Sequence, residues 1–279
     1  MITFSGLGHN GKLGNQMFQY ACLYSIAKKN GYDFSIPSTS LEWKNVVNYY
    51  NSRMYLLDIF NISARVEPPI KQIHNTCVYN DAIFNPQLFT IQDNTDISGY
   101  FQSEKYFEHC AEDIRCEFSF KNKELLADVD REFETLPTKI GIHVRRGDYV
   151  KYANVHPLCT LEYYKEAVRI LRETCTENPI LYVFSDDINW CKANFTGQFS
   201  EEIIYDEEPE SGERYFTHQE KTMMKMSKCD KIVIANSSYS WWGAWLGNKK
   251  EVIAPTNWFG DKPFNEFSDI FASGWKVIY

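Results

Sequence analysis

The chain has 279 residues, about twice the usual domain length, so two α/β domains or one large domain both fit and a substantial core can be buried. Its formal net charge of −8 argues against nucleic acid or an anionic membrane as the main partner. No segment approaches the ~20 apolar residues of a membrane span and no secretion signal is recognisable, so we expect a cytoplasmic protein. The eight cysteines form no CxxC pair and no metal-ligand rhythm, so we expect reduced thiols and no metal site.

The first predicted elements are a strand at Ile2 to Phe4, a glycine-rich loop at Ser5 to Gly14, and a helix from about Asn15 to Lys29. Apolar residues recur at helical spacing in this helix, and Lys28-Lys29-Asn30-Gly31 supplies cations and a stop signal at its end. A strand, loop and helix in this order are typical of a ligand-binding α/β unit.

The glycine-rich loop matches two phosphate-binding motifs, neither of them fully. Gly6 to Gly11 spells G-x-G-x-x-G, and Gly6 to Lys12 spells most of a P-loop. The P-loop needs Ser or Thr where this chain has Leu13, and the dinucleotide motif needs its helix to begin at the third glycine, whereas the loop is predicted to continue to Gly14. We therefore expect a loop whose backbone approaches some ligand, with Asn15 at the start of the helix.

Between Ile36 and Val129 the patterns are weak and indicate an irregular α/β region. A charged helix is predicted at Asn122 to Glu134, and Leu136-Pro137 is taken as the boundary between two domains. Asp128 and Asp130 mimic the D-x-D of metal-dependent sugar transferases, but their place in a polar helix favours solvated surface carboxylates.

A dense polar cluster follows the apolar run that begins at Ile140. The cluster His143-Val-Arg-Arg-Gly-Asp148 is predicted to lie at the carboxyl end of a buried strand, where ligands bind in open parallel sheets. Two adjacent guanidinium groups suit phosphate or carboxylate. The alternative to such a ligand site is that the cluster is structural, with an ion pair between Arg146 and Asp148.

Two more polar clusters follow predicted strands. Asp186 comes directly after the strand at Ile180 to Phe184, and Ser237 to Ser240 follow the strand at Lys231 to Ala235. Strands that alternate with helices indicate a doubly wound parallel sheet, so the three clusters are expected to meet at one edge of it. The other elements predicted here are a Thr160-capped helix to Leu171, a strand at Ile203 to Tyr205, helices at His218 to Lys228 and Trp241 to Leu246, and a last strand at Glu251 to Pro255.

Four sequence blocks together resemble the α-1,2-fucosyltransferases of glycosyltransferase family 11. They are Gly11-Lys-Leu-Gly-Asn-Gln-Met-Phe-Gln-Tyr-Ala21, His143-Val-Arg-Arg-Gly-Asp-Tyr149, Phe184-Ser-Asp-Asp187 and Asn236-Ser-Ser-Tyr-Ser-Trp-Trp-Gly-Ala-Trp-Leu246.

The resemblance implies an α/β protein of GT-B class, with two Rossmann-like domains facing a cleft. Residues 1–136 would form the acceptor-side domain with the glycine-rich loop, and residues 137–279 the domain that binds GDP-fucose. The implied reaction is inverting transfer of L-fucose from GDP-β-L-fucose to the 2-hydroxyl of a galactose-terminated oligosaccharide or polysaccharide, with no cofactor and no metal.

The resemblance also implies residue roles. Arg145 would neutralise the β-phosphate of the departing GDP, and His143 would touch the nucleoside or a phosphate. Asp186 would accept the N–H donors of guanine. Phosphate would be bound by Ser237, Ser238 and the backbone of Tyr239, whereas Gly14 and Asn15 would contact the fucose or the acceptor. Arg146 is also counted among the donor-binding residues and is expected to pair with Asp148.

The general base is left open between two residues. Asp148 is nearest to the arginines, but a carboxylate paired with arginine has a lowered pKa and is a poor base. His156 has a suitable intrinsic pKa, although a lone histidine before a proline is more often structural.

Two other functions compete with sugar transfer. The first is a dinucleotide-dependent oxidoreductase built on Gly6 to Gly11, with Asp33 as the ribose-binding acid. The second is a non-catalytic glycan-binding protein that uses exposed aromatic side chains, which make up part of the 16% aromatic content.

Overall fold

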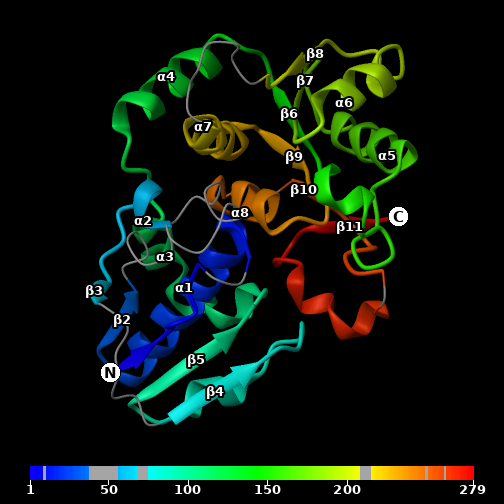
Figure 1. Ribbon diagram of the computed structural model, residues 1–279. Coiled ribbons are helices and arrows are strands. Elements are labelled where there is room, and N and C mark those ends of the chain that lie inside the picture. Colours follow the sequence, from blue (N-terminus) through cyan, green and yellow to red (C-terminus); the bar gives the residue numbers. More distant parts are fainter. Residues whose placement is uncertain (9–10, 38–55, 68–74, 208–214, 249–250, 261) are drawn as a thin grey trace. The chain divides into compact units, whose positions relative to one another are not determined.

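The computed structural model describes residues 1–8, 11–37, 56–67, 75–207, 215–248, 251–260 and 262–279. These residues form two compact units. The first comprises Met1–Lys121 with Ser268–Ile270, and the second comprises Asn122–Phe267 with Phe271–Tyr279. Each unit is built on a parallel sheet flanked by helices (Figure 1).

The sheet of the first unit has the strand order β3-β2-β1-β5-β4, and every neighbouring pair is parallel. Its strands are β1 (Ile2–Thr3), β2 (Phe34–Pro37), β3 (Arg65–Glu67), β4 (Asn75–Tyr79) and β5 (Thr95–Gly99). The helical segments are α1 (Leu13–Asn30), α2 (Leu56–Ile59), η2 (Pro86–Thr90), η3 (Glu104–Tyr106), η4 (Glu108–Cys110), α3 (Ala111–Glu117) and η7 (Ser268–Ile270).

Helix α1 begins earlier than predicted. Its first residue is Leu13, so Gly14 lies in the first turn and not in the loop, which corrects the expectation of a start at Asn15. The predicted stop is confirmed, because Gly31 takes a left-handed conformation with φ of 69° and its N–H bonds to the carbonyl of Ala27.

The weakly patterned middle of the chain contributes regular structure to the first unit. Strand β5 pairs with β1 at the centre of the sheet, although its residues gave no clear strand signal. The buried carboxylate of Glu117 accepts hydrogen bonds from the hydroxyl of Tyr20 at 2.6 Å and the backbone N–H of Ser63 at 2.8 Å. Such long-range polar contacts order the region and leave no periodic signature in the sequence.

The sheet of the second unit has the order β11-β10-β9-β6-β7-β8 and is also parallel throughout. Its strands are β6 (Lys139–Val144), β7 (Ile180–Ser185), β8 (Ile203–Tyr205), β9 (Lys231–Val233), β10 (Val252–Pro255) and β11 (Lys276–Ile278). The helical segments are α4 (Lys123–Glu134), η5 (Gly147–Val150), α5 (Leu161–Arg172), α6 (Ile188–Phe195), α7 (Tyr215–Lys228), α8 (Ser238–Leu246) and η6 (Phe264–Glu266).

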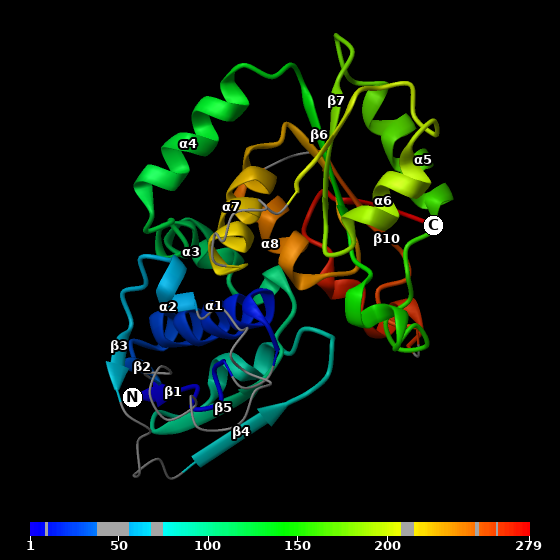
Figure 2. The same cartoon turned by 45° about the horizontal axis from the view of Figure 1, so that its top comes forward.

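Helices cover both faces of this second sheet. Figures 1 and 2 show α5 and α6 on one face and α7 and α8 on the other. All six residues of β6 are buried, as expected for a central strand of a doubly wound sheet. The alternation of strands and helices predicted for this half of the chain is therefore confirmed.

The predicted helix ends in this unit differ from the structure by a few residues. The Thr160 cap of α5 is confirmed, because its Oγ1 accepts the backbone N–H of Tyr163 at 3.2 Å. Helix α8 begins at Ser238 and not at Trp241, since the N–H of Trp241 already bonds to the carbonyl of Ser237 at 3.0 Å. Helix α7 likewise begins at Tyr215, three residues before the predicted start at His218.

The units divide between Lys121 and Asn122, whereas the sequence suggested a boundary after residue 136. Helix α4 therefore belongs to the second unit. It packs there because Phe133 contacts the ring of Tyr182 at 5.1 Å and Glu132 pairs with the buried Lys225 of α7 at 2.9 Å.

Within the described ranges, none of the helices combines the length and the apolar composition needed to cross a membrane.

Candidate functional site

The strand order of the second unit contains a topological switch point. From β6 the chain continues through β7 and β8 on one side and then crosses to β9, β10 and β11 on the other. Ligands in such sheets bind outside the carboxyl ends of the strands at this reversal, which here lies between β6 and β9. The predicted clusters at His143–Asp148 and at Ser237–Ser240 follow these two strands.

Arg145 is fixed between two carboxylates. Its Nη1 atom lies 2.6 Å from Oδ2 of Asp186, and its Nη2 atom donates to Oδ1 of Asp148. The guanidinium carbon also lies 5.2 Å from the centre of the Tyr149 ring, and 18% of the side chain is exposed. The structure thus presents an oriented, permanently charged group at the end of β6.

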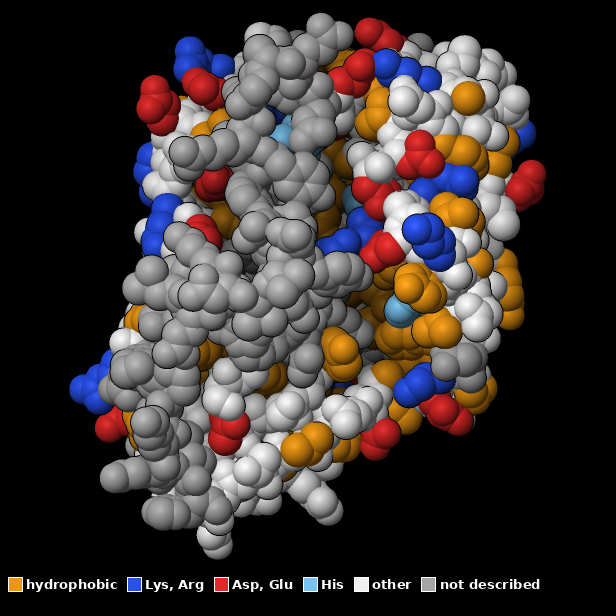
Figure 3. All heavy atoms as spheres, in the orientation of Figure 1, with side chains coloured by type: hydrophobic (Ala, Val, Ile, Leu, Met, Phe, Trp, Pro, Cys, Tyr) orange, Lys and Arg blue, Asp and Glu red, His pale blue; other side chains and the backbone are white. Residues whose placement is uncertain are grey.

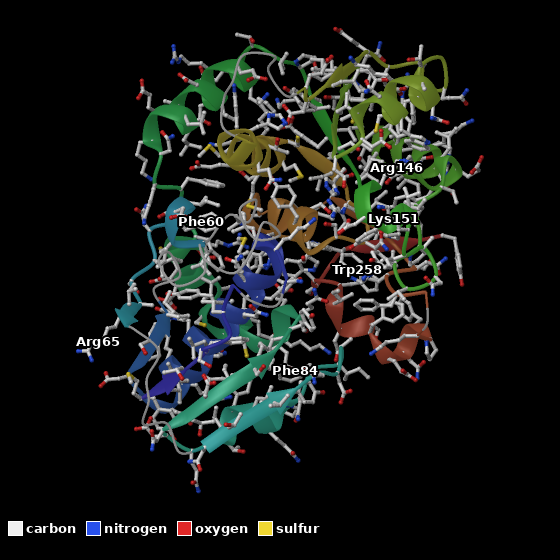
Figure 4. All side chains as sticks on the ribbon, in the orientation of Figure 1. Phe60, Arg65, Phe84, Arg146, Lys151 and Trp258 are labelled. Carbon is white, nitrogen blue, oxygen red and sulfur yellow. The ribbon has the colours of Figure 1, made fainter. Side chains whose placement is uncertain are left out.

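The predicted pair between Arg146 and Asp148 is wrong. The backbone turns sharply at Arg146, where φ is −132° and ψ is −70°, and η5 then brings Asp148 beside Arg145. Arg146, which is labelled in Figure 4, instead contacts the start of α6. Its Nε atom lies 3.2 Å from Oδ2 of Asp187, and its guanidinium carbon lies 4.1 Å from the centre of the Trp190 ring. Arg146 therefore braces the loop after β6 against α6.

Asp186 ties the ends of β6 and β7 together. Its Oδ2 forms an ion pair with Nη1 of Arg145 at 2.6 Å, and its Oδ1 accepts the backbone N–H of Arg146 at 2.9 Å. A Cβ atom at Gly147 would lie 2.3 Å from Oδ2 of Asp186, so this close approach needs glycine. Both carboxylate oxygens are thus engaged by the arginine loop. The guanine contact of Asp186 stays a prediction.

His143 lies buried at the end of β6. Its pKa is lowered to about 3, chiefly by burial and further by the positive charge of Arg145, so the ring is neutral near pH 7. Its Nδ1 atom has no hydrogen-bond partner among the described residues, and its ring centre lies 6.1 Å from that of Tyr239. A neutral imidazole with an unsatisfied nitrogen can bond to a ligand group that enters this space.

Ser237, Ser238 and Tyr239 form the amino end of α8. Ser237 is its N-cap in an extended conformation and makes no side-chain cap bond. In the part of the chain that the structure describes, the hydroxyls of Ser237 and Ser238 bond to no other protein group, whereas the hydroxyl of Tyr239 donates to the carbonyl of Gln219. The hydroxyls and first-turn N–H groups are arranged as in helix N-termini that bind anions.

Asn236 is an organising residue to which the sequence analysis gave no role. Its side-chain Nδ2 donates to the carbonyls of Pro157 at 2.9 Å and Trp258 at 3.2 Å, and its own carbonyl accepts the hydroxyl of Tyr149 at 3.1 Å. It therefore joins the loops that follow β6, β9 and β10. The signals in the sequence were its position between a predicted strand and the two serines, and its place at the start of one of the four resembling blocks.

The two candidate bases lie near Tyr149. Asp148 pairs with Arg145, which contacts that ring, and His156 stacks on the ring with 4.6 Å between centres and 16° between planes. The assignment of the base to either residue stays a prediction.

The predicted residues of the first unit lie at the start of α1. Oδ1 of Asn15 accepts from Nε2 of Gln102 at 2.8 Å, and Gly11, with φ of 98°, packs against the Asn15 side chain. Residues 9 and 10 of the glycine-rich loop lie outside the described residues. Gly14 and Asn15 thus follow the carboxyl end of β1, with Gln102 as a partner that the sequence did not indicate.

The oxidoreductase alternative conflicts with the position of Asp33. A ribose-binding acid belongs at the carboxyl end of the second strand. Asp33 directly precedes β2, and its carbonyl accepts the N–H of Ile2 at the opposite edge of the sheet.

The carboxylates of the D-x-D sequence are paired with surface cations, as their place in a polar helix suggested. Asp128 pairs with Arg131, and Asp130 pairs with Lys228 at 2.6 Å. Over the described residues, no group of three or more His, Cys, Asp or Glu side chains is arranged to hold a metal ion.

Residues 5–279 match the family model described as glycosyl transferase family 11. An α-1,2-colitosyltransferase of Escherichia coli is 32% identical over 92% of this chain and 93% of its own length. The galactoside α-(1,2)-fucosyltransferase 2 of Pongo pygmaeus is 24% identical over 91% of this chain and 72% of its own length.

The fold is shared with a solved fucosyltransferase. The crystal structure of the NodZ α-1,6-fucosyltransferase soaked with GDP-fucose superposes with a TM-score of 0.54 at 15% identity, covering 88% of this chain and 91% of that chain. The predicted α/β, GT-B class with two parallel sheets is thereby confirmed. The family model extends over almost the whole sequence and one relative exceeds 30% identity, so the chain belongs to glycosyl transferase family 11.

Proposed function

We propose that this chain is an inverting α-1,2-fucosyltransferase that moves L-fucose from GDP-β-L-fucose to the 2-hydroxyl of a galactoside. The observation that carries the proposal is the oriented guanidinium of Arg145, which shares the switch point of the second sheet with the amino end of α8. A cation beside a helix N-terminus suits a diphosphate whose negative charge grows as it leaves. The names of the relatives supply the sugar and the linkage.

The donor roles follow from this arrangement. Ser237, Ser238 and the Tyr239 N–H bind the diphosphate, and His143 offers a neutral ring nitrogen to the nucleotide. Arg145 neutralises the β-phosphate oxygen while the bond between that oxygen and C1 of fucose breaks. Asp186 and Arg146 keep the arginine loop in place.

The transfer itself is a single displacement with inversion. The acceptor 2-hydroxyl oxygen forms a bond to C1 of fucose, GDP departs with the electrons of the broken bond, and the hydroxyl proton goes to a general base. Asp148 and His156 are the two candidates, as in the sequence analysis. Gly14 and Asn15 of the first unit contact the fucose or the acceptor.

The proposal includes no cofactor and no metal, because Arg145 and the α8 N-terminus already provide positive charge for the leaving group. Transfer should therefore persist in EDTA. It also includes a cytoplasmic location, which eight free thiols favour, and fractionation of cells that produce the protein tests this.

A second donor has support from one observation, the 32% identity to an α-1,2-colitosyltransferase. Colitose is L-fucose without its 3-hydroxyl, so GDP-colitose would occupy the same diphosphate site. Competition between GDP-fucose and GDP-colitose for one acceptor decides which sugar is preferred.

The direct test has two stages. GDP at micromolar concentration should raise the melting temperature while NAD leaves it unchanged, and the reverse result would support the oxidoreductase. GDP-fucose should then be incubated with a panel of β-galactosides and the product linkage assigned by NMR. Binding of free glycan without any sugar transfer would instead support the glycan-binding protein.

A further inference from the structure

A continuous row of aromatic rings leads away from the arginine site of the second unit. We call it the aromatic strip, and it consists of Tyr149, His156, Phe259, Phe267, Phe264 and Phe271. The ring centres of successive members lie 4.6 Å apart for Tyr149 and His156, 6.2 Å for His156 and Phe259, and 5.6 Å for Phe259 and Phe267. Phe264 then lies 5.6 Å from Phe267 and 5.7 Å from Phe271.

The outer part of the strip is open to solvent. Phe264 is 47% exposed. Tyr152 does not belong to the strip, but its carbonyl accepts the backbone N–H of His156 at 2.8 Å and its side chain is 58% exposed. Figure 3 shows hydrophobic side chains gathered around a histidine on the part of the surface where Figure 4 labels Lys151 and Trp258. Large aromatic side chains gathered on a surface usually mark a binding site.

The loops that carry the strip are fixed to each other. The N–H of Gly260 bonds to the carbonyl of Val155 at 2.9 Å, and a Cβ atom at Gly260 would lie 2.4 Å from the carbonyl oxygen of Asn154. Asn236 bonds to both loops as well, through Pro157 and Trp258. The segments that carry His156 and Phe259 are therefore preorganised, which reduces the entropy lost when a ligand binds against them.

The inner end of the strip belongs to the proposed catalytic site. The guanidinium of Arg145 lies over the ring of Tyr149, and this ring also stacks with that of His156. The strip therefore begins where the reacting sugar must lie. A sugar ring has an apolar C–H face and polar edges, and aromatic rings flanked by hydroxyl and amine groups match both. Here the exposed Tyr152 and Lys151 supply such polar groups.

We propose that the aromatic strip is an acceptor subsite, which binds the saccharide units next to the galactoside that receives the fucose. The inference rests on the proposed transferase function and extends it to a preference for longer acceptors. An anionic lipid surface is the competing ligand, but Lys151 and Lys262 lie in the same segments as Asp148 and Glu266, so these segments carry no excess of positive charge.

Kinetics with acceptors of two lengths tests the proposal. The strip variants are Phe264→Ala, which removes a member of the strip, and Tyr152→Ala, which removes the exposed ring from the loop that carries His156. They are compared with the control Tyr279→Ala, which removes an 87% exposed ring from the end of the same unit. With a β-galactoside trisaccharide, each strip variant should raise the acceptor KM about two- to tenfold, the range expected for loss of one aromatic contact. With methyl β-galactoside the KM should stay unchanged, and so should the KM for GDP-fucose.

The outcomes separate the alternatives. Equal effects of the strip variants on both acceptors, or no effect on either, would overturn the subsite while leaving the transferase function intact. Loss of binding to phosphatidylglycerol vesicles without a change in acceptor preference would assign the strip to a lipid surface. Failure of the wild type to transfer fucose to either acceptor while hydrolysing no GDP-fucose would count against the proposed function itself.

Discussion

Arg145 and Asp186 lie on neighbouring strand ends and form an ion pair, with 2.6 Å between Nη1 and Oδ2. The parallel pairing of β6 with β7 sets Val144 opposite Ser185, so the residue that follows each strand reaches the same place. The carboxylate therefore orients the one guanidinium that we assign to the leaving group. This relationship supports an orienting role for Asp186, whereas the guanine contact that the resemblance implies stays a prediction.

Replacement of Asp186 distinguishes these two roles. In Asp186→Asn the charge that orients Arg145 is lost while the side-chain oxygen can still accept the N–H of Arg146. We expect kcat to fall about 10- to 100-fold, the size of one close contact between charged groups, with little change in the affinity for GDP. Steady-state kinetics and calorimetric titration with GDP and with inosine diphosphate, which lacks the exocyclic amine of guanine, provide the measurement.

A loss of GDP affinity that is absent for inosine diphosphate would restore the guanine role. Asp128→Asn is the matched control, because that carboxylate pairs with Arg131 on the surface of α4 and should leave every constant unchanged. Gly147→Ala should act in the same direction as Asp186→Asn, since the new Cβ would collide with the Asp186 carboxylate.

Arg145→Ala removes the proposed stabiliser of the leaving GDP. We expect kcat to fall about 10³-fold, as for the loss of a principal electrostatic group, while the protein still folds because the side chain lies at the end of β6 and outside the core. Activity and the melting temperature are measured together. Arg169→Ala, which loses contacts to Glu166 and Glu173 on the exposed face of α5, should keep full activity. Retention of more than a small fraction of transfer by Arg145→Ala would remove it from the assigned role.

The sequence predicted the location of the site better than its internal contacts. Polar residues directly after buried strands must collect at the carboxyl edge of a parallel sheet, so His143, Asp186 and Ser237 were predictable from the strand pattern alone. The ion pairs of Arg145 and Arg146 were not predictable in this way, because they depend on backbone angles in short turns. Because of the turn at Arg146, its side chain contacts Asp187 and Trp190, and Asp148 pairs with Arg145 instead.

Long-range contacts explain most of the other differences between the predicted and the observed structure. The amide of Asn236 reaches carbonyls in two loops that follow other strands, and no local pattern shows where such loops will approach. Strand β5 has few apolar residues, and its place beside β1 follows from pairing with its neighbours. The start of α1 at Leu13 was hidden by Gly14, which local helix propensity disfavours but which the buried first turn accommodates.

His143 should make stability depend on pH. Its pKa is lowered in the folded protein to about 3, against 6.5 for an ordinary histidine, so the unfolded chain binds more protons between these values and stability falls as the pH is lowered through this range. Between pH 7 and pH 5 this contribution amounts to about 2 kcal/mol. The free energy of unfolding is measured in urea at pH 7 and pH 5 for the wild type and for His143→Gln. The loss of stability between these two pH values should be about 2 kcal/mol smaller in the variant.

His109→Gln is the comparison for this experiment. The pKa of His109 is also lowered, chiefly by the partial desolvation of its ring. His109 lies on the surface, however, so we expect its replacement to change the pH dependence of stability less than the replacement of the buried His143. An identical pH dependence for wild type and His143→Gln would mean that the buried ring does not resist protonation.

Asn236→Ala tests the connection between the three loops at the carboxyl edge of the second sheet. The substitution leaves the carbonyls of Pro157 and Trp258 without their donor, and unpaired buried acceptors cost about 1 to 3 kcal/mol. Because Asn236 precedes the diphosphate-binding serines and accepts from Tyr149, kcat/KM should fall as well.

The control is Asn194→Ala. The amide of Asn194 makes a single bond of 2.8 Å to the carbonyl of Trp190 within the same helix, so its loss should cost less than about 1 kcal/mol. If urea unfolding gave equal losses for the two variants and activity were unchanged in both, Asn236 would be an ordinary loop residue and the rigidity assigned to the aromatic strip would lose its main support.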